Sequence, residues 1–139
     1  MDVFSKEKRS EIMSRVRGKD TKPEKIVRSA LFRAGLRFRL HCAALPGKPD
    51  VILPKYRAVV FVHGCFWHRH PGCRHATTPA TNLDYWTRKF ERNVARDAEE
   101  IRNLKQAGWR VFVVWECEIA KPGFLESLAG RIRGGESGV

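Results

Sequence analysis

The stretch AVVFVHGCFWHRHPGCRH, residues 58–75, combines a strong strand signal with a dense set of reactive side chains. Its first part, residues 58–62, is a continuous apolar run, which is typical of a central strand covered on both faces. Residues 63–75 then contain two cysteines, four histidines and the adjacent rings of Phe66 and Trp67. Metal ligands, titratable imidazoles and aromatic rings together predict a site that binds metal, moves protons and contacts a flat aromatic ligand.

The sequence around this stretch predicts an α/β fold. Helices are expected at residues 21–34, 82–107 and 122–132, and strands at residues 36–40, 51–53, 58–62 and 110–115. A strand, a long helix and a second strand normally form a crossover between parallel strands, whose C-terminal ends lie at one edge of the sheet. The residues that follow 58–62 and 110–115 are therefore expected to come close together.

Length and composition fit a single domain, residues 1–139, with a strong positive charge. The chain has 27 Lys and Arg against 15 Asp and Glu, a formal net charge of +12, which favours a polyanionic partner such as nucleic acid. No apolar run could cross a bilayer and no signal peptide is visible, so we expect a cytoplasmic protein with no membrane partner. A monomer is the default expectation. Residues 1–20 are predicted to be a basic DNA-binding segment and residues 134–139 a frayed tail.

Three potential metal ligands follow the apolar run: Cys65, His70 and Cys73. The predicted crossover brings Cys117, which follows the last strand, to the same edge of the sheet. Three cysteines and one histidine form a closed tetrahedral zinc site of the structural kind, which would hold together a loop that has few apolar residues. His75 is an alternative to His70, and Cys42 is expected to be a buried thiol. Disulfides are not expected in a reducing compartment.

Several acidic and histidine side chains are candidates for acid–base chemistry. Asp97 falls inside the apolar stripe of the long helix, where a carboxylate is costly unless it is paired or lies near a metal or an imidazole. His63 and His68 can act as general acid or base near neutral pH. Glu24 also lies on an apolar helix face, although a capping box accounts for it. Asp50 follows a Gly-Lys-Pro turn and by itself indicates only turn chemistry.

Three aromatic residues are candidates for contacts with bases. Phe66 and Trp67 stand outside any periodic pattern, and Trp86 begins the long helix soon after them. Rings beside basic groups are suited to stack on bases or to insert between base pairs. The helical phase of Trp86 fits core packing as well, so a core role stays open for Trp86 and Phe66.

Four motifs resemble those of the very-short-patch repair (Vsr) DNA mismatch endonucleases. They are LPGKPD at 45–50, VHGCFWH at 62–68, RNVARD at 92–97 and GWRVFVVWEC at 108–117. The resemblance extends over residues 5–130 in matching order, with Arg69 interrupting a histidine cluster that is common in the family. It implies a restriction-endonuclease-like core of the PD-(D/E)xK class, with a mixed central sheet flanked by helices and a loop held together by zinc.

The resemblance also implies an activity and partners. Members of the family nick one strand of double-stranded DNA 5′ to the thymine of a T·G mismatch, which arises when 5-methylcytosine deaminates. The implied partners are DNA with such a mismatch, a cognate cytosine-5 methyltransferase system and helper repair proteins. The implied cofactors are catalytic magnesium and structural zinc.

Roles for individual residues follow from the same resemblance. Asp50 and the backbone carbonyl of Val62 would hold magnesium, while His68 would be the general acid or base. Asp97 would orient His68, and Glu24 and His63 would complete the site, with His63 at about the place where related nucleases carry a lysine. Zinc would be bound by Cys65, His70, Cys73 and Cys117. The rings that would insert beside the mismatch are Phe66, Trp67 and Trp86.

Two other interpretations stay open. A zinc-stabilised DNA-binding module without catalytic activity would use the cysteines, the positive charge and the aromatic rings, but it would not need a carboxylate at Asp97. A nuclease of the same fold could instead act as a restriction-type enzyme on matched duplex DNA.

Overall fold

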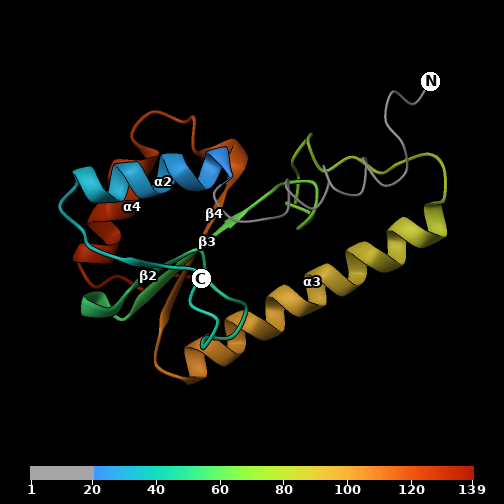
Figure 1. The fold of residues 1–139 in the computed structure, drawn as a ribbon. Helices are drawn as coiled ribbons and strands as arrows, with labels where there is room; N and C mark the ends of the chain where they lie inside the picture. The colour runs from blue at the N-terminus through green and yellow to red at the C-terminus, as the bar shows by residue number, and fades with distance from the viewer. Residues whose placement is uncertain (1–20) are drawn as a thin grey trace.

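The computed structural model describes residues 21–139, which form a mixed α/β fold with a four-stranded sheet (Figure 1). The helices are α2 (Lys22–Arg33), α3 (Leu83–Gln106) and α4 (Phe124–Arg133), and short 3-10 turns lie at Pro54–Tyr56 and Glu116–Glu118. The strands are β1 (Arg39–Leu40), β2 (Val51–Leu53), β3 (Ala58–His63) and β4 (Arg110–Trp115). The predicted basic segment, residues 1–20, lies outside the described residues.

The sheet combines an antiparallel meander with one parallel pair. Its order is β1-β2-β3-β4, in which β1, β2 and β3 are antiparallel neighbours and β3 and β4 run parallel. The long helix α3 connects the parallel pair, so the predicted crossover is confirmed. The first strand is shorter than predicted, because only two of its residues pair with β2, whereas Leu36 is buried between the helices and the sheet.

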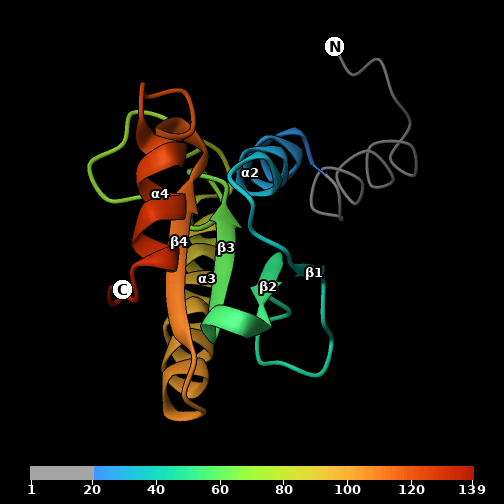
Figure 2. The same ribbon diagram turned by 90° about the vertical axis from the view of Figure 1, so that its left-hand side faces the viewer.

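Two apolar clusters cover the two faces of the sheet. Figures 1 and 2 show α2 and α4 on one face and α3 on the other. The cluster on the α2 and α4 face includes Val27, Val60 and Val114, and the cluster on the α3 face includes Phe61 and Leu104. Because alternate residues of a strand point to opposite faces, the apolar runs of β3 and β4 supply both clusters.

The apolar stripe of α3 is only partly buried, contrary to what its periodicity predicts. Phe90 and Leu104 are buried, but Leu83 and Val94 are 53% and 46% exposed. A helix of 24 residues is about 36 Å long. A six-residue strand such as β4 spans only about 20 Å. The N-terminal half of α3 therefore extends beyond the sheet (Figure 1).

The chain around α4 also differs from prediction. The helix begins at Phe124 rather than at residue 122, with Gly123 at its N-cap. The tail 134–139, which was expected to be frayed, is hydrogen-bonded to β4: the N–H of Val139 donates to the Val111 carbonyl at 2.7 Å. Arg110 donates to the carbonyl of Glu136 at 2.7 Å. The outer edge of β4 has free backbone groups, which the tail partly satisfies. Among residues 21–139, no helix has the length and apolarity needed to cross a membrane.

Candidate active site and metal cluster

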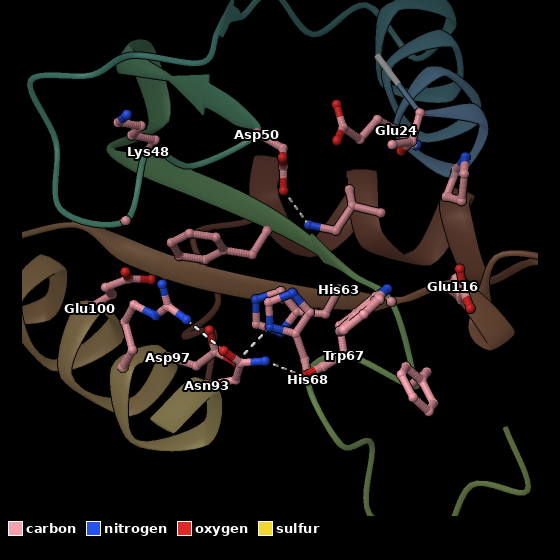
Figure 3. Close-up of a pocket in the computed structure, with 18 of the residues that line it drawn as sticks. Glu24, Lys48, Asp50, His63, Trp67, His68, Asn93, Asp97, Glu100 and Glu116 are labelled. Atoms are coloured by element: carbon pink, nitrogen blue, oxygen red, sulfur yellow. Dashed lines mark hydrogen bonds and ion pairs between the residues drawn. The ribbon is translucent and has the colours of Figure 1, made fainter. Parts of the chain in front are cut away.

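A wide cleft opens at the C-terminal end of β3, between α2, the loop before β2, and α3 (Figure 3). Its volume is about 1640 Å³. It is lined by all five side chains that the sequence analysis proposed for the catalytic centre: Glu24, Asp50, His63, His68 and Asp97. His41, which the sequence analysis did not select, lines it as well. The fold thus gathers into one cleft residues that lie far apart in the sequence.

Asp50 is held at the start of β2 by a hydrogen bond from β3. The backbone N–H of Val62 donates to its Oδ2 atom at 2.6 Å. Burial and the nearby charge of Glu24 raise the pKa of Asp50 from 3.8 to about 7, although the Val62 hydrogen bond acts in the opposite direction. Ligand atoms of Glu24, His41 and Asp50 all lie within 4.8 Å of one another. Two carboxylates and an imidazole at this spacing are a donor set that suits a divalent cation.

The capping pattern explains only part of the position of Glu24. Thr21 is the N-cap of α2, and its side chain accepts a hydrogen bond from the backbone N–H of Glu24 at 3.4 Å. The Glu24 carboxylate, however, is directed into the cleft (Figure 3), and the residue is only 6% exposed. Its Oε2 atom is 3.5 Å from Nε2 of His41. Glu24 therefore belongs to the cleft as well as to the helix start.

His68 and Asp97 form a close pair on the other side of the cleft. Nδ1 of His68 is 2.6 Å from Oδ2 of Asp97. The ring of His63 stacks on that of His68, with centroids 3.9 Å apart and an interplanar angle of 5°. Burial and the adjacent His68 lower the pKa of His63 to about 4. His63 is thus a neutral imidazole at neutral pH, and it cannot supply the positive charge of a lysine.

Alternation along β3 explains why these groups form two separate walls. Phe61 belongs to the apolar cluster on the α3 face, and Val62 packs against the cluster on the opposite face. His63, two residues after Phe61, faces α3 again and meets its partners there. Figure 3 shows these two sets on either side of β3. We name Glu24, His41 and Asp50 the acidic wall, and His63, His68 and Asp97 the histidine wall.

A separate cysteine cluster, which consists of Cys65, His70, Cys73 and Cys117, lies at the same edge of the sheet. All four ligand atoms lie within 4.8 Å of one another. Nδ1 of His70 is 3.7 Å from the sulfur of Cys65 and 3.3 Å from that of Cys117. In tetrahedral zinc sites the ligands lie about 2.0–2.3 Å from the metal, which places N and S about 3.5 Å apart. The donor set and its spacing therefore fit zinc.

The fold shifts the pKa values of two cluster thiols in opposite directions. Burial and neighbouring thiols raise the pKa of Cys65 to about 12, whereas backbone hydrogen bonds lower the pKa of Cys73. A bound metal ion would stabilise the thiolates that ligation requires. His75 is exposed and lies outside the cluster, so His70 is the histidine that the fold brings to the cysteines. Cys42, expected to be buried, is only half-buried and packs on the α3 face.

Trp115 connects the cysteine cluster to the histidine wall through ring contacts. It is paired with His63 across the parallel strands, and the two rings meet edge to face at 5.2 Å. On its other side the indole stacks on His70, with centroids 4.3 Å apart and an interplanar angle of 11°. A continuous series of rings therefore runs from His70 through Trp115 and His63 to His68.

The three candidate DNA-inserting residues are packed together beside the cleft. The ring of Phe66 lies 4.9 Å from that of Trp67 and 5.9 Å from that of Trp86. It also meets the buried ring of Phe90 edge-on at 5.2 Å. All three candidates are half-buried, so they are anchored to α3 while part of each ring stays accessible. Insertion of these rings into DNA stays a prediction.

Arg69 organises the loop that carries these residues, a role that the sequence did not indicate. Its guanidinium donates to the backbone carbonyls of Thr77 at 2.8 Å and of Ala76 at 2.9 Å. It also lies 4.0 Å from the centre of the Phe90 ring. Arg69 has a φ of +54°, which few residues other than glycine adopt. Arg69, which stands where many members of the resembled family have a histidine, therefore stabilises this loop.

Positively charged side chains surround the cleft. Those that line it are Lys22, Lys48, Lys89, Arg92 and Arg96. Three of the five, Lys89, Arg92 and Arg96, lie on α3. Basic side chains of this kind contact phosphate groups in protein–DNA complexes. The guanidinium of Arg96 donates to the side-chain oxygen of Asn93 at 2.5 Å, and the Asn93 amide donates to the Trp67 carbonyl at 3.1 Å. These bonds tie the loop to α3.

Comparison with known proteins agrees with this geometry. The family model "DNA mismatch endonuclease Vsr" matches residues 1–74. The chain is 45% identical over 118 residues to the DNA mismatch endonuclease Vsr of Escherichia coli. This alignment covers 85% of the chain and 75% of that protein. It is 52% identical over 126 residues to the type II nicking enzyme V.XorIIP of Xanthomonas oryzae, and the alignment covers 91% of this chain and 92% of that protein. The type II nicking enzyme V.NmeAIP of Neisseria meningitidis is 40% identical over 131 residues, which covers 94% and 93%. The chain belongs to the Vsr family of DNA mismatch endonucleases, enzymes that cleave DNA.

Proposed function

We propose that this protein nicks one strand of duplex DNA on the 5′ side of the thymine in a T·G mismatch, with magnesium as the catalytic ion. The observation that carries the proposal is that one cleft, which is lined by both basic and acidic side chains, holds the buried carboxylate of Asp50 together with the His68–Asp97 pair. The names of the relatives, a mismatch endonuclease and several nicking enzymes, support the same reaction.

Asp50 and the backbone carbonyl of Val62 would hold the magnesium ion. The hydrogen bond from the N–H of Val62 fixes one oxygen of Asp50, and the carboxylate also lies beside Glu24, with which it would share a metal. Burial and the charge of Glu24 both raise the pKa of Asp50, and a cation would offset both effects. When bound, magnesium would polarise the scissile phosphate and activate a water molecule.

His68 is the proposed general acid or base. Because Nδ1 is paired with Asp97 at 2.6 Å, Nε2 is the ring atom available to exchange a proton with water or with the leaving oxygen. The stacked ring of His63 restricts rotation of the His68 ring. His63 itself has a buried Nδ1 atom with no hydrogen-bond partner among residues 21–139.

Recognition of the mismatch would rest on Phe66, Trp67 and Trp86. A mismatched step unstacks at a lower free-energy cost than a paired one, so ring insertion favours a T·G site over matched DNA. The rings are anchored on one another and are partly accessible, which suits a rigid wedge. The net charge of +12 would supply binding that is independent of sequence.

The remaining proposals concern the fold and its context. The antiparallel meander with a parallel fourth strand supports a PD-(D/E)xK core in which Pro49 and Asp50 supply the first two motif residues. Zinc at the cysteine cluster would hold the loop that carries His68 and Trp67. We also propose that the enzyme acts as a monomer beside a cytosine-5 methyltransferase system and helper repair proteins.

A strand-nicking assay tests the proposal. Labelled duplexes with a central T·G, C·G or T·A pair would be incubated with magnesium or with EDTA in several flanking contexts. We expect magnesium-dependent cutting of the thymine strand in the T·G duplex alone. Cutting of the matched duplexes would favour a restriction-type nuclease, and tight binding without cutting would favour the non-catalytic module.

Substitutions in the two walls provide the catalytic control. Asp50→Ala and His68→Ala are each expected to abolish nicking while binding to the T·G duplex is retained. If either variant nicks at the rate of the unmodified protein, the assignment of these residues is wrong.

A further inference from the structure

We propose that His41 is a nitrogen ligand of the cation in the cleft, which makes this active site bind Mn²⁺ in preference to Mg²⁺. The inference rests on the proposed function, in that it concerns the cation held by Asp50, and it adds a ligand and a metal preference to it.

Strand register places His41 next to the proposed metal position. In the antiparallel pair β1–β2, Arg39 lies opposite Ile52 and Leu40 lies opposite Val51. Extending this register by one residue sets His41 opposite Asp50. His41 has a φ of +50°, so the chain turns out of β1 at this residue and enters the following loop. Histidine is among the few residues other than glycine that adopt this left-handed conformation with some frequency.

The distance between His41 and Glu24 is that of an ion pair without a short hydrogen bond, and it lies within the range open to two ligands of one ion. Nε2 of His41 is 3.5 Å from Oε2 of Glu24. Charge-assisted hydrogen bonds between such groups are about 2.7–2.9 Å long. By contrast, two ligands at ~2.1 Å from one octahedral ion lie about 3.0 Å apart if adjacent and about 4.2 Å apart if opposite.

Burial adds to the case for a ligand. The side chains of His41 and Glu24 are only 14% and 8% exposed. Their ligand atoms and that of Asp50 lie within 4.8 Å of one another, so small side-chain movements would bring all three onto one ion. A cation balances two carboxylates in a confined site, and an imidazole next to it would bind as the neutral ligand that metals require.

The donor atoms determine which cation is favoured. Magnesium prefers a complete set of oxygen ligands and retains several waters. An imidazole nitrogen strengthens binding of first-row transition ions, which include Mn²⁺, relative to magnesium. A site with Asp50, Glu24 and His41 should therefore favour Mn²⁺, whereas a site without His41 would show little such preference.

Pulsed electron paramagnetic resonance of Mn²⁺ added to the full chain tests the ligand directly. We expect the ¹⁴N coupling of a bound imidazole, its replacement by a ¹⁵N coupling in protein made with ¹⁵N-histidine, and its loss in His41→Gln. The isotope comparison requires no substitution, so it holds even if the variant is unstable. The absence of histidine coupling, or its survival in folded His41→Gln, would overturn the proposal, because in the latter case another histidine would be the ligand.

Metal affinities provide the second measurement. In His41→Gln we expect the Kd for Mn²⁺ to rise by at least roughly tenfold, with a much smaller change for Mg²⁺. His75→Gln is the matched control, because that histidine is exposed and lies outside the three clusters. Equal changes for the two ions in His41→Gln would contradict the proposed preference.

Nicking of the T·G duplex distinguishes this inference from the proposed function. If the protein nicks with magnesium but shows no histidine coupling to Mn²⁺, the nuclease assignment stands and the role of His41 is wrong. If coupling is present and no duplex is nicked with either ion, the ligand stands and the proposed reaction is wrong.

Discussion

The cysteine cluster and the catalytic cleft lie at the same edge of the sheet, but the chain builds them in different ways. Three of the four cluster ligands lie within residues 65–73, and only Cys117 comes from a distant segment. The two walls of the cleft draw their six residues from α2, the ends of β1, β2 and β3, the following loop and α3. The first site depends mainly on spacing in the sequence, whereas the second depends on the whole fold.

This difference separates two kinds of loss. Removing a ligand from the cysteine cluster should release the loop that carries His68, Phe66 and Trp67, so that binding and catalysis fail together. Removing one residue of the cleft should leave the fold and the DNA-binding surface in place and stop only the chemistry. Four substitutions, ordered by the size of the expected effect, test this separation.

Cys117→Ser is expected to have the largest effect. Loss of the ligand that joins the loop to β4 should release zinc and lower the Tm by about 10 °C or more. Nicking and preferential binding to T·G duplexes should both be lost. Metal analysis, thermal unfolding and gel-shift assays measure these effects. Cys42→Ser is the matched control, since Cys42 lies outside the cluster. Retention of zinc and of the original Tm by Cys117→Ser would contradict the role of the cluster.

Asp50→Asn is expected to reduce nicking by about 10³-fold or more while mismatch binding in EDTA persists.

The same variant should be more heat-stable than the unmodified protein in EDTA at pH 8. Because the pKa of Asp50 is raised from 3.8 to about 7, the native state holds a proton that the unfolded chain releases. Its contribution to stability is present below pH 4 and is lost as the pH rises through 7, whereas asparagine has no proton to lose.

The measurement for Asp50→Asn is the Tm of both proteins in EDTA from pH 5 to pH 8. The advantage of the variant should increase with pH over this range. A difference in Tm that does not change with pH would show that Asp50 is already ionised in the metal-free protein.

Asp97→Asn is expected to lower nicking by about 10²-fold, because the amide cannot stabilise a protonated His68 as the carboxylate does. The pair should act as a unit. The double variant His68→Asn/Asp97→Asn should therefore be no slower than His68→Asn alone. Single-turnover nicking rates test this expectation. Additive losses would mean that the 2.6 Å contact between the two side chains is not used in catalysis.

Arg92→Ala is expected to have the smallest effect. Loss of one phosphate contact should weaken binding to T·G and matched duplexes equally and reduce the slope of log K against log salt by about 0.9. Arg102→Ala, an exposed position on the same helix that does not line the cleft, is the matched control. A loss of affinity confined to the T·G duplex would instead make Arg92 a mismatch-reading residue.

The comparison between the two sites also explains what the sequence could predict. Apolar runs and helical periodicity predicted β2, β3, β4 and α3, and the crossover rule correctly placed Cys117 beside Cys65. These features depend on local pattern and one topological step. The extent of burial along α3 was wrong, because periodicity does not reveal how far the sheet extends under a helix.

His41 and Trp115 could not be found in this way. The position of His41 opposite Asp50 depends on the register between β1 and β2. In the same way, Trp115 lies beside His63 because of the register between β3 and β4. Register is a property of paired strands rather than of either strand alone. The raised pKa of Asp50 likewise arises from burial and from Glu24, a residue on another element.

The end of β3 fixes the distance between the two walls of the cleft. Val62 anchors the acidic wall through its N–H, and His63, the very next residue, supports the histidine wall through its ring. Two adjacent residues of one strand, which rises by about 3.3 Å per residue, therefore set the separation of the two walls. A one-residue insertion or deletion in β3 would exchange the faces that these groups occupy. Such a change is expected to be far less tolerated than a change of similar size in the loops that carry the remaining catalytic residues.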